Sequence, residues 1–532
     1  MNEKTVNIVG AGLSGLSAAI TLSRMGIHSR LVSSQPSERA QSVLAEGGIN
    51  AALDTMGESD TPADHFSDTM KGGCFLESEA AIKELTENAP RVVTELFRLG
   101  TPFQNENGRL TLRNFGGQKK KRTAYAKSST GKMIMTALID EVRKYEAQGL
   151  VERFPHHDLV YIKTDEKTLQ SIFVKDLYTG EFMSLGGCTI LCTGGLNGFF
   201  EGMTTGTTQN TGNAAALAFG AGAELANLEF IQYHPTTVAI SGKRMLISEA
   251  ARGEGGKLFI MKNGKPWYFM EEKYELGSLM PRDVVSREMF FVKNASECTG
   301  DVFLDMTTIG GDVWSGKLSD LRKEIVSYLK QDPKKEPIAV SPGIHFFMGG
   351  IRVNDRFETN IKGLFAAGEA ACKFHGANRL GGNSMLGAVF GGETAARAAS
   401  KSAEGSQVKP VPDYKDSVSS PQIRARLRDL LLGGLGIVRS GETMKAALAE
   451  LEALYSAKGI SKIDRLRVSV GIAAVESALA REESRGAHFR KDFPKTSEAF
   501  RRQTVARLEN GRPVITFEKI GGEGALKDEV HS

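Results

Sequence analysis

The side chains that could do chemistry lie in four separate segments of the chain. Residues 229–256 hold a histidine before a proline, then a Ser-Glu pair and an arginine, and residues 280–287, 342–351 and 363–392 add two arginines and a histidine among other residues. Guanidinium and imidazole groups bind anions, and the planar fork of arginine suits a carboxylate. The candidates are therefore His234, Ser248, Glu249, Arg252, Arg282, His345 and Arg379.

Each candidate also has a purely structural interpretation. A proline follows His234, which places it in a turn rather than inside a helix, but a core histidine fits the same context. Glu249 and Arg252 lie three residues apart, so they share a face if a helix forms, and a surface ion pair is the alternative. For Arg282 the alternative is a bidentate pair with Asp283 or another carboxylate that stabilises a domain interface, and for His345 it is a structural histidine before a glycine bend.

Arg379 lies in the most unusual stretch, residues 363–392, which is dense in glycine and alanine. Glycine permits close backbone approach, so such a stretch suits backbone pressed against something large and flat. A lone arginine there is costly to bury without an anion beside it. We interpret the stretch as a loop and helix start that close over a cofactor, with Arg379 directed at an anionic substrate. A tightly packed helix pair is the alternative.

The elements that must position these groups begin at the N-terminus. Residues 6–19, VNIVGAGLSGLSAA, predict a buried strand, a turn with Gly10, Gly12 and Gly15, and a helix. The glycines allow the turn, the approach of a pyrophosphate and close helix–strand packing, which indicates dinucleotide binding. The next strand ends in Ser33 rather than in the usual acid, so its hydroxyl is the candidate contact to the adenosine ribose.

A second glycine-rich stretch, AEGGINAA, occupies residues 45–52. The backbone of Ala45, Gly47 and Gly48 would suit a position along a flavin ring. A plain turn before a helix is the alternative.

Composition limits the remaining classes. The 532 residues predict two to four domains, and 67 basic against 63 acidic residues give no reason to expect a nucleic acid partner. No apolar run reaches the length of a membrane-spanning helix, and a strand begins too early to leave room for a signal peptide. The five cysteines are scattered, which argues against iron–sulfur or haem ligation and for a reducing compartment. We expect a cytoplasmic protein without a metal site, which could reach a membrane through a partner.

Several ordered motifs resemble the flavoprotein subunits of succinate dehydrogenase and fumarate reductase, together with their relative L-aspartate oxidase. They include AQSVLAEGGINAAL, TILCTGGL, the HPTT and SEAARGEGG segments, MPRDVVSR, HFFMGG, HGANRLGGNS and ESRGAHFRKDFP, between about residues 6 and 494. The resemblance implies an α/β fold with a Rossmann-like FAD-binding domain (1–232 and 343–410) and an inserted α+β capping domain (233–342). Helical apolar spacing after residue 411 predicts a C-terminal helical domain (411–532).

The resemblance implies FAD as the cofactor. In membrane-bound respiratory members a histidine joined covalently to FAD stands where this chain has Gln41, which implies non-covalent FAD and a lower flavin potential that favours fumarate reduction. Asn213 stands where the family commonly has aspartate, and its amide can still cap a helix. The further cofactor contacts implied by the matching motifs are Thr193, Gly194, Asn213, Glu369, Asn383, Ser384 and Leu386.

The same resemblance implies a C4-dicarboxylate substrate. Arg379, His234 and His345 would hold its carboxylates, with Ser248 in place of the family's usual threonine. Arg282 would be the proton donor. Guanidinium is a poor acid, so this role requires Glu249 and Arg252 to relay protons to Arg282 in a closed, desolvated site. Phe115 and Gln118 would help to close the pocket.

Two alternatives remain open. L-aspartate oxidases tend to carry a glutamate where Phe115 stands, and that difference favours the dicarboxylate interpretation. The chain could also be an electron-transferring subunit that works with an iron–sulfur protein.

Overall fold

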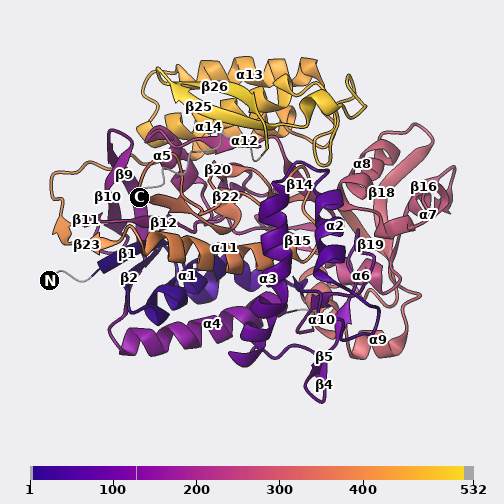
Figure 1. Ribbon diagram of the computed structural model, residues 1–532. Helices are drawn as coiled ribbons and strands as arrows, with labels where there is room; N and C mark the ends of the chain where they lie inside the picture. The colour runs from indigo at the N-terminus through magenta and orange to yellow at the C-terminus, as the bar shows by residue number, and fades with distance from the viewer. Residues whose placement is uncertain (1–3, 128, 521–532) are drawn as a thin grey trace.

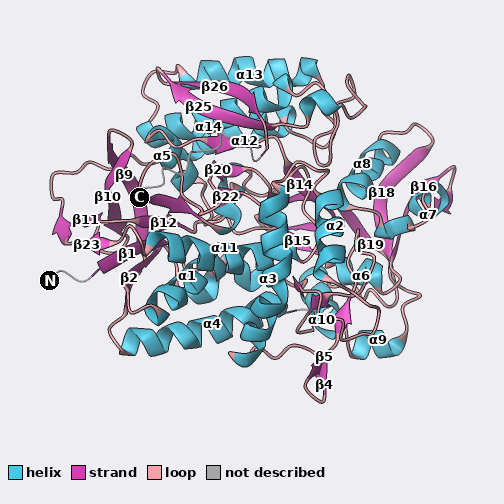
Figure 2. Cartoon of the chain, viewed as in Figure 1, coloured by secondary structure: helices cyan, strands magenta, loops and turns pink. Residues whose placement is uncertain are grey.

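The computed structural model describes residues 4–127 and 129–520 (Figures 1 and 2). A parallel sheet in the order β21-β12-β1-β2-β8 forms its centre, with the short β23 antiparallel to β1. Its strands are rich in buried apolar residues, as expected for a sheet covered on both faces. The strands are β1 (Lys4–Val9), β2 (His28–Ser33), β8 (Val151–Pro155), β12 (Thr189–Leu191), β21 (Leu364–Ala366) and β23 (Glu404–Gly405).

Helices α1 (Leu13–Arg24) and α11 (Asn383–Ala399) pack against each other beside this sheet, next to α3 (Glu79–Arg98) and α4 (Thr130–Ala147). A Cβ at Gly15 would lie 1.8 Å from the Gly10 carbonyl oxygen, so close helix–strand packing requires that glycine. A Cβ at Gly392 would lie 2.2 Å from the Ser14 carbonyl oxygen, where α11 crosses α1. The predicted strand, glycine turn and helix are confirmed, and the far half of the glycine-alanine stretch is indeed a close helix pair.

An antiparallel sheet flanks this core. It has the order β24-β11-β10-β9, with β9 (His157–Asp165), β10 (Thr168–Asp176), β11 (Phe182–Gly186) and β24 (Val408–Pro410). The intervening chain contains α2 (Pro62–Gly72), α5 (Asn213–Gly220) and the short strands β3 (Ile49–Asn50), β4 (Asn105–Glu106), β5 (Arg109–Leu110), β6 (Leu112–Arg113) and β7 (Thr123–Ala124).

The capping unit is a sheet with helices on the right of Figure 1. Its strand order is β15-β14-β19-β18-β16-β17, and its own apolar core extends from Met245 to Val340. The strands are β14 (Ile231–Ile240), β15 (Lys243–Leu246), β16 (Lys257–Lys262), β17 (Lys265–Trp267), β18 (Cys298–Asp305) and β19 (Ile338–Phe347). The helices are α6 (Glu249–Gly253), α7 (Phe269–Lys273), α8 (Arg282–Lys293), α9 (Gly311–Ser315) and α10 (Ser319–Leu329).

The predicted capping-domain boundaries fall inside β14 and β19. These strands pair with each other, and their ends at Ile231 and Phe347 belong to the central core, whereas Val340 belongs to the capping core. The two units are therefore joined through continuous strands and not through loops.

The C-terminal segment contains α12 (Pro421–Gly434), α13 (Gly441–Tyr455) and α14 (Lys462–Ala480), at the top of Figure 1. It also contributes the hairpin β25 (Gln503–Glu509) and β26 (Arg512–Glu518), which joins β13 (Leu225–Ala226), β20 (Gly350–Arg352) and β22 (Ala371–Cys372) in one sheet. Its helices share the central apolar core, so the unit is neither wholly helical nor separately packed. Within residues 4–127 and 129–520, no helix has the length and apolar character needed to cross a bilayer.

Candidate active site

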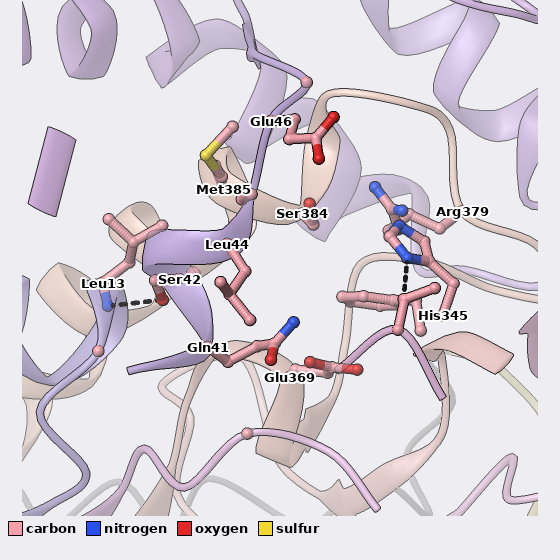
Figure 3. A pocket seen from close by; sticks show the side chains of 18 of the residues that line it. Leu13, Gln41, Ser42, Leu44, Glu46, His345, Glu369, Arg379, Ser384 and Met385 are labelled. Carbon is pink, nitrogen blue, oxygen red and sulfur yellow. Dashed lines mark hydrogen bonds between the residues drawn. The ribbon is translucent and has the colours of Figure 1, made fainter. Parts of the chain in front are cut away.

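Two adjoining cavities, of about 170 and 150 Å³, run along the carboxyl edge of the parallel sheet. They share several lining residues, which makes them parts of one elongated groove; these are Gly12, Gln41, Ser42, Cys192, Gly194 and Asn210. The first cavity, shown in Figure 3, brings together Arg379, His345, Glu46 and Ser384, with Gln41 and Leu13 on its other side. We call it the ring cavity and the second one the adenosine cavity.

The groove fits an extended dinucleotide. Gly10 and Gly12 line the adenosine cavity at the start of α1, where backbone N–H groups and the helix dipole favour a pyrophosphate. Ser33 lies at the far end of the same cavity, and Thr193 and Asn213 also line it. The ring cavity is bordered by the backbone of Ala45, Gly47 and Gly48, and by Glu369, Ser384 and Gly194. The residues of the adenosine cavity would hold the adenosine half of FAD, and those of the ring cavity would hold its flavin ring.

Arg282 enters the ring cavity from the first residue of α8, in the capping unit. Its Nε and Nη2 both donate to Oε2 of Glu249, at 2.8 and 2.6 Å, and its Nη1 donates to Oε1 of Gln232 at 3.1 Å. Of the carboxylates that could pair with Arg282, the partner is Glu249. The Oδ1 of Asp283 accepts from Asn378. Guanidinium has five N–H groups, so the described contacts leave two of them for a ligand.

Arg379 enters the same cavity from the central unit. Its Nη2 donates to Oε1 of Gln232 at 3.0 Å, and its guanidinium lies 4.5 Å from the ring centre of Phe346. Its Nε is buried without a partner among the described residues. Burial and then the neighbouring Arg282 lower the pKa of Arg379 to about 9. A buried cation whose donor has no protein partner is suited to bind an anion at this cavity.

The two histidines lie together at the cavity that both arginines line. The rings of His234 and His345 are 5.2 Å apart, and both line the ring cavity. The Nδ1 of His345 lies 2.8 Å from the hydroxyl of Thr205, and the Nδ1 of His234 accepts from the backbone N–H of Thr236. Burial and then Arg282 hold the pKa of both histidines well below the ordinary value. Both rings are therefore neutral and can donate or accept without adding charge.

Glu249 connects Arg282 to Arg252. Its Oε1 lies 3.8 Å from Nη2 of Arg252 and accepts from the backbone N–H of Gly116 at 3.0 Å. Burial by itself raises the pKa of the Glu249 carboxyl, but Arg282 and Arg252 outweigh it and bring the value to about 2. Arg252 is fully buried and does not line the cavity, so the three groups form a chain that leads away from the ligand.

Comparison with known proteins identifies the family. The FAD binding domain family matches residues 5–385, and the family described as fumarate reductase flavoprotein C-term matches residues 462–524. The succinate dehydrogenase flavoprotein subunit of Bacillus subtilis is 34% identical, over 94% of this chain and 92% of its own length. This chain belongs to the succinate dehydrogenase and fumarate reductase flavoprotein family. It is an FAD-dependent oxidoreductase of that type.

Two further relatives of this flavoprotein mark the range of the family. A structure of Escherichia coli quinol fumarate reductase superposes with a TM-score of 0.87 at 27% identity, covering 97% of this chain and 96% of that one. The L-aspartate oxidase of Streptomyces coelicolor is 31% identical, over 95% of this chain and 92% of its own length. Because identities to relatives with different named activities are so close, overall similarity does not select the substrate.

The structure corrects several expected positions in the flavoprotein. Gln118 does not line the ring cavity, because its Nε2 donates to Asn50 and Gly381 and its Oε1 accepts from the Phe115 backbone. Asn383 is likewise turned away, since its amide is bonded to Asn50, His65 and Thr69. Leu386 is fully buried in the core and lines neither cavity. Gly15 also lines neither cavity, and it allows the close helix–strand packing that was expected of this motif.

Two local conformations also differ from expectation. His234 lies within strand β14 and not in a turn, and Pro235 is accommodated by a shift in the register between His234 and Thr237. The Asn213 amide does not cap α5, whose N-cap is Gly212, and its Oδ1 accepts from Arg467 instead. Ser33 lines the adenosine cavity as expected, although its hydroxyl donates to the Gln35 carbonyl.

Sequence reasoning missed two important groups of the flavoprotein. Gln232 accepts from both arginines with one oxygen while its Nε2 donates to Asn378 and to the Arg379 carbonyl. The one sequence signal for Gln232 was that it lies two residues before His234, because residues two apart on a strand point to the same face. Glu46 lines the ring cavity with a buried, unpartnered Oε2, and burial holds the pKa of its carboxyl well above the ordinary value. Glu46 lies between Ala45 and Gly47, whose backbone was predicted to border the flavin, and no sequence signal distinguished its side chain.

Proposed function

We propose that this flavoprotein interconverts fumarate and succinate, and that it favours fumarate reduction with non-covalently bound FAD. The observation that carries the proposal is the pair of arginines. Arg282 and Arg379 come from two different units, share one neutral acceptor in Gln232, and keep unmet N–H groups at the same cavity.

The charge of the ring cavity supports a dianion. Arg282 and Arg379 both line the cavity, and Arg282 pairs with Glu249, whose pKa is about 2. The other two carboxyls that line it are harder to ionise, because burial raises the pKa of Glu369 to about 7 and that of Glu46 well above its ordinary value. The neutral histidines add hydrogen-bonding capacity without further charge. A small molecule with two carboxylates would balance the excess positive charge, and guanidinium forks suit each carboxylate.

Bound FAD would supply or accept a hydride at its ring. The protein would hold one substrate carboxylate at Arg379 and the other near His234 and Ser248, with His345 polarising the substrate. In fumarate reduction, Arg282 would protonate the alkene carbon opposite to the one that receives the hydride. Arg282 would regain its proton from Arg252 by way of Glu249, whose carboxylate is ionised at rest and would take a proton from Arg252 as it passes one to Arg282. Arg252 would in turn be reprotonated from the side away from the substrate, and the capping unit would exclude water from the site.

Phe115 supports a dicarboxylate over an amino acid substrate. It is buried, lines the ring cavity and stands where a glutamate would meet a substrate ammonium group in L-aspartate oxidases. The neighbouring Gly116 lets the backbone approach Glu249, since a Cβ there would lie 2.5 Å from its Oε1. This segment therefore closes the cavity with an apolar ring and no additional acid.

The direct test is anaerobic reoxidation of the reduced flavoprotein by a panel of acids. Fumarate is expected to reoxidise the flavin much faster than iminoaspartate or monocarboxylate enoates do. Failure of fumarate to reoxidise it would refute the proposal. Release of hydrogen peroxide with L-aspartate in air would favour the amino acid oxidase activity instead.

We further propose that the cofactor is not covalently attached, because Gln41 at the junction of the two cavities cannot form the histidyl link. Acid precipitation of the holoprotein is expected to leave all flavin in the supernatant, with a midpoint potential low enough to favour fumarate reduction. Flavin that remains with the precipitated protein would contradict this expectation.

An iron–sulfur protein is the proposed electron-transfer partner, at the inner face of a membrane or in the cytoplasm. The support is that relatives are named as flavoprotein subunits, whereas this chain has scattered cysteines and, in its described residues, no cluster of metal-ligating side chains. A cysteine-rich protein that co-purifies with the chain would identify this partner.

A further inference from the structure

An arginine from the C-terminal unit reaches the loop that borders the adenosine cavity. Arg467 lies on α14 and is 1% exposed. Its Nη2 donates to the Gly198 carbonyl at 2.9 Å, and its Nη1 donates to the Thr211 carbonyl and, at 2.8 Å, to Oδ1 of Asn213. These acceptors are all neutral oxygens. Burial lowers the pKa of Arg467 to about 10, although the charge of Asp464 acts in the opposite direction. Such a costly arrangement indicates that Arg467 does more than fill space.

The guanidinium group of Arg467 holds the loop of residues 210–213 both by hydrogen bonds to it and through the ring of Phe199. It lies 4.4 Å from the ring centre of Phe199, and that ring in turn contacts Gly212, where a Cβ would be 2.6 Å from it. Gly212 has φ +76°, so the loop conformation depends on glycine at this point. The backbone of Gly198 also donates to the Asn210 carbonyl. Residues 210–214 all line the adenosine cavity, whereas Arg467 itself does not.

The contact with Asn213 also determines which end of that amide is available. Guanidinium can donate hydrogen bonds but cannot accept them, so the carbonyl oxygen of Asn213 must face Arg467. The amide NH₂ group is then the end left for the cavity that Asn213 lines. An NH₂ group offers donors to a phosphate, a ribose oxygen or an adenine nitrogen. An aspartate at this position would offer only acceptors.

We propose that Arg467 is a positioning residue for the adenosine diphosphate half of FAD. It holds residues 210–213 in place and orients the Asn213 amide as a donor, so that the C-terminal unit contributes to cofactor retention without touching the cofactor. The inference depends on FAD binding in this groove and not on the choice of substrate.

The test is the affinity of the apoprotein for FAD, ADP and FMN, measured by flavin fluorescence and calorimetry. Arg467→Met is expected to weaken FAD and ADP binding by the same factor, about tenfold or more, because charge-assisted hydrogen bonds are lost. FMN, which lacks the adenosine half, is expected to bind as in the native chain. Arg465→Met, an exposed arginine on the same helix, is the matched control.

Two outcomes would overturn the proposal. One is unchanged ADP affinity in a folded Arg467→Met variant, and the other is an equal loss for FMN, which would indicate general damage to the groove. Asn213→Ala provides an independent test if Arg467→Met does not fold, because it removes the side chain through which Arg467 holds this position while the Gly198 and Thr211 carbonyls still accept from the guanidinium. It is expected to weaken ADP binding several-fold while FMN binding is kept, and unchanged ADP affinity there would also refute the proposal.

Discussion

Replacement of Arg282 by alanine is expected to abolish nearly all fumarate reduction while FAD remains bound. The variant loses the proposed proton donor, one of two cations at the ring cavity, and the partner of the buried Glu249. General acid catalysis alone contributes about 10²- to 10⁴-fold, and charge stabilisation adds to that. We therefore expect kcat to fall by about 10⁴-fold, measured with an artificial electron donor and fumarate.

Two further variants make this result specific. Arg287→Ala alters the next turn of α8, where the side chain stacks on Phe489 outside the ring cavity, and should keep most of the activity. Arg282→Lys keeps the charge but not the fork that spans Glu249 and Gln232, so it is expected to recover only a small part of kcat. Substantial turnover in the alanine variant, with its FAD content unchanged, would rule out the proposed role.

Replacement of Arg379 by glutamine is expected to weaken dicarboxylate binding by about 10²-fold or more. Arg379 is the buried cation with an unmet Nε, and each hydrogen bond to a charged group is worth about 1.5–3 kcal/mol. Binding is measured by the change in flavin absorbance when a non-reacting dicarboxylate such as malonate is added. The native protein should prefer malonate to propionate strongly, and the variant should lose most of that preference.

The matched control is Arg397→Gln, on the exposed part of α11, where the side chain pairs with Glu393. It should bind malonate like the native chain. If Arg379→Gln instead keeps its preference for the dicarboxylate, the second carboxylate must be held elsewhere, and the proposed orientation of the substrate is wrong.

Local pattern alone was enough to predict the nucleotide-binding part of the fold. The order of apolar strand residues, the spacing of Gly10, Gly12 and Gly15, and the apolar helix residues are all read from consecutive positions. The contacts that require these glycines are partly distant, since a Cβ at Gly10 would lie 2.1 Å from the Cys192 carbonyl oxygen. The helical spacing of the C-terminal segment, also read from consecutive positions, predicted α12, α13 and α14. The hairpin that pairs with β13, far away in sequence, could not be found in this way.

The candidate site was only partly predictable, and the errors share a physical cause. Gln118 and Asn383 were expected at the ligand because their motifs resemble those of a family, but side-chain direction depends on which polar groups lie nearby. Both amides are held by Asn50, which lies far from Asn383 in sequence. His234 was placed in a turn because Pro235 follows it, yet pairing with β19 holds the segment as a strand.

The sequence by itself determined the residue types that can bind an anion and the glycine turns that admit a dinucleotide, because these properties belong to single residues and short spacings. Only the tertiary structure decided which groups face one another. Gln232 became the shared acceptor of Arg282 and Arg379, Glu249 became the carboxylate that pairs with Arg282, and Arg467 came to hold Asn213, which lines the adenosine cavity. These pairings join residues tens to hundreds of positions apart, and only the packing of the folded chain brings them within hydrogen-bonding distance.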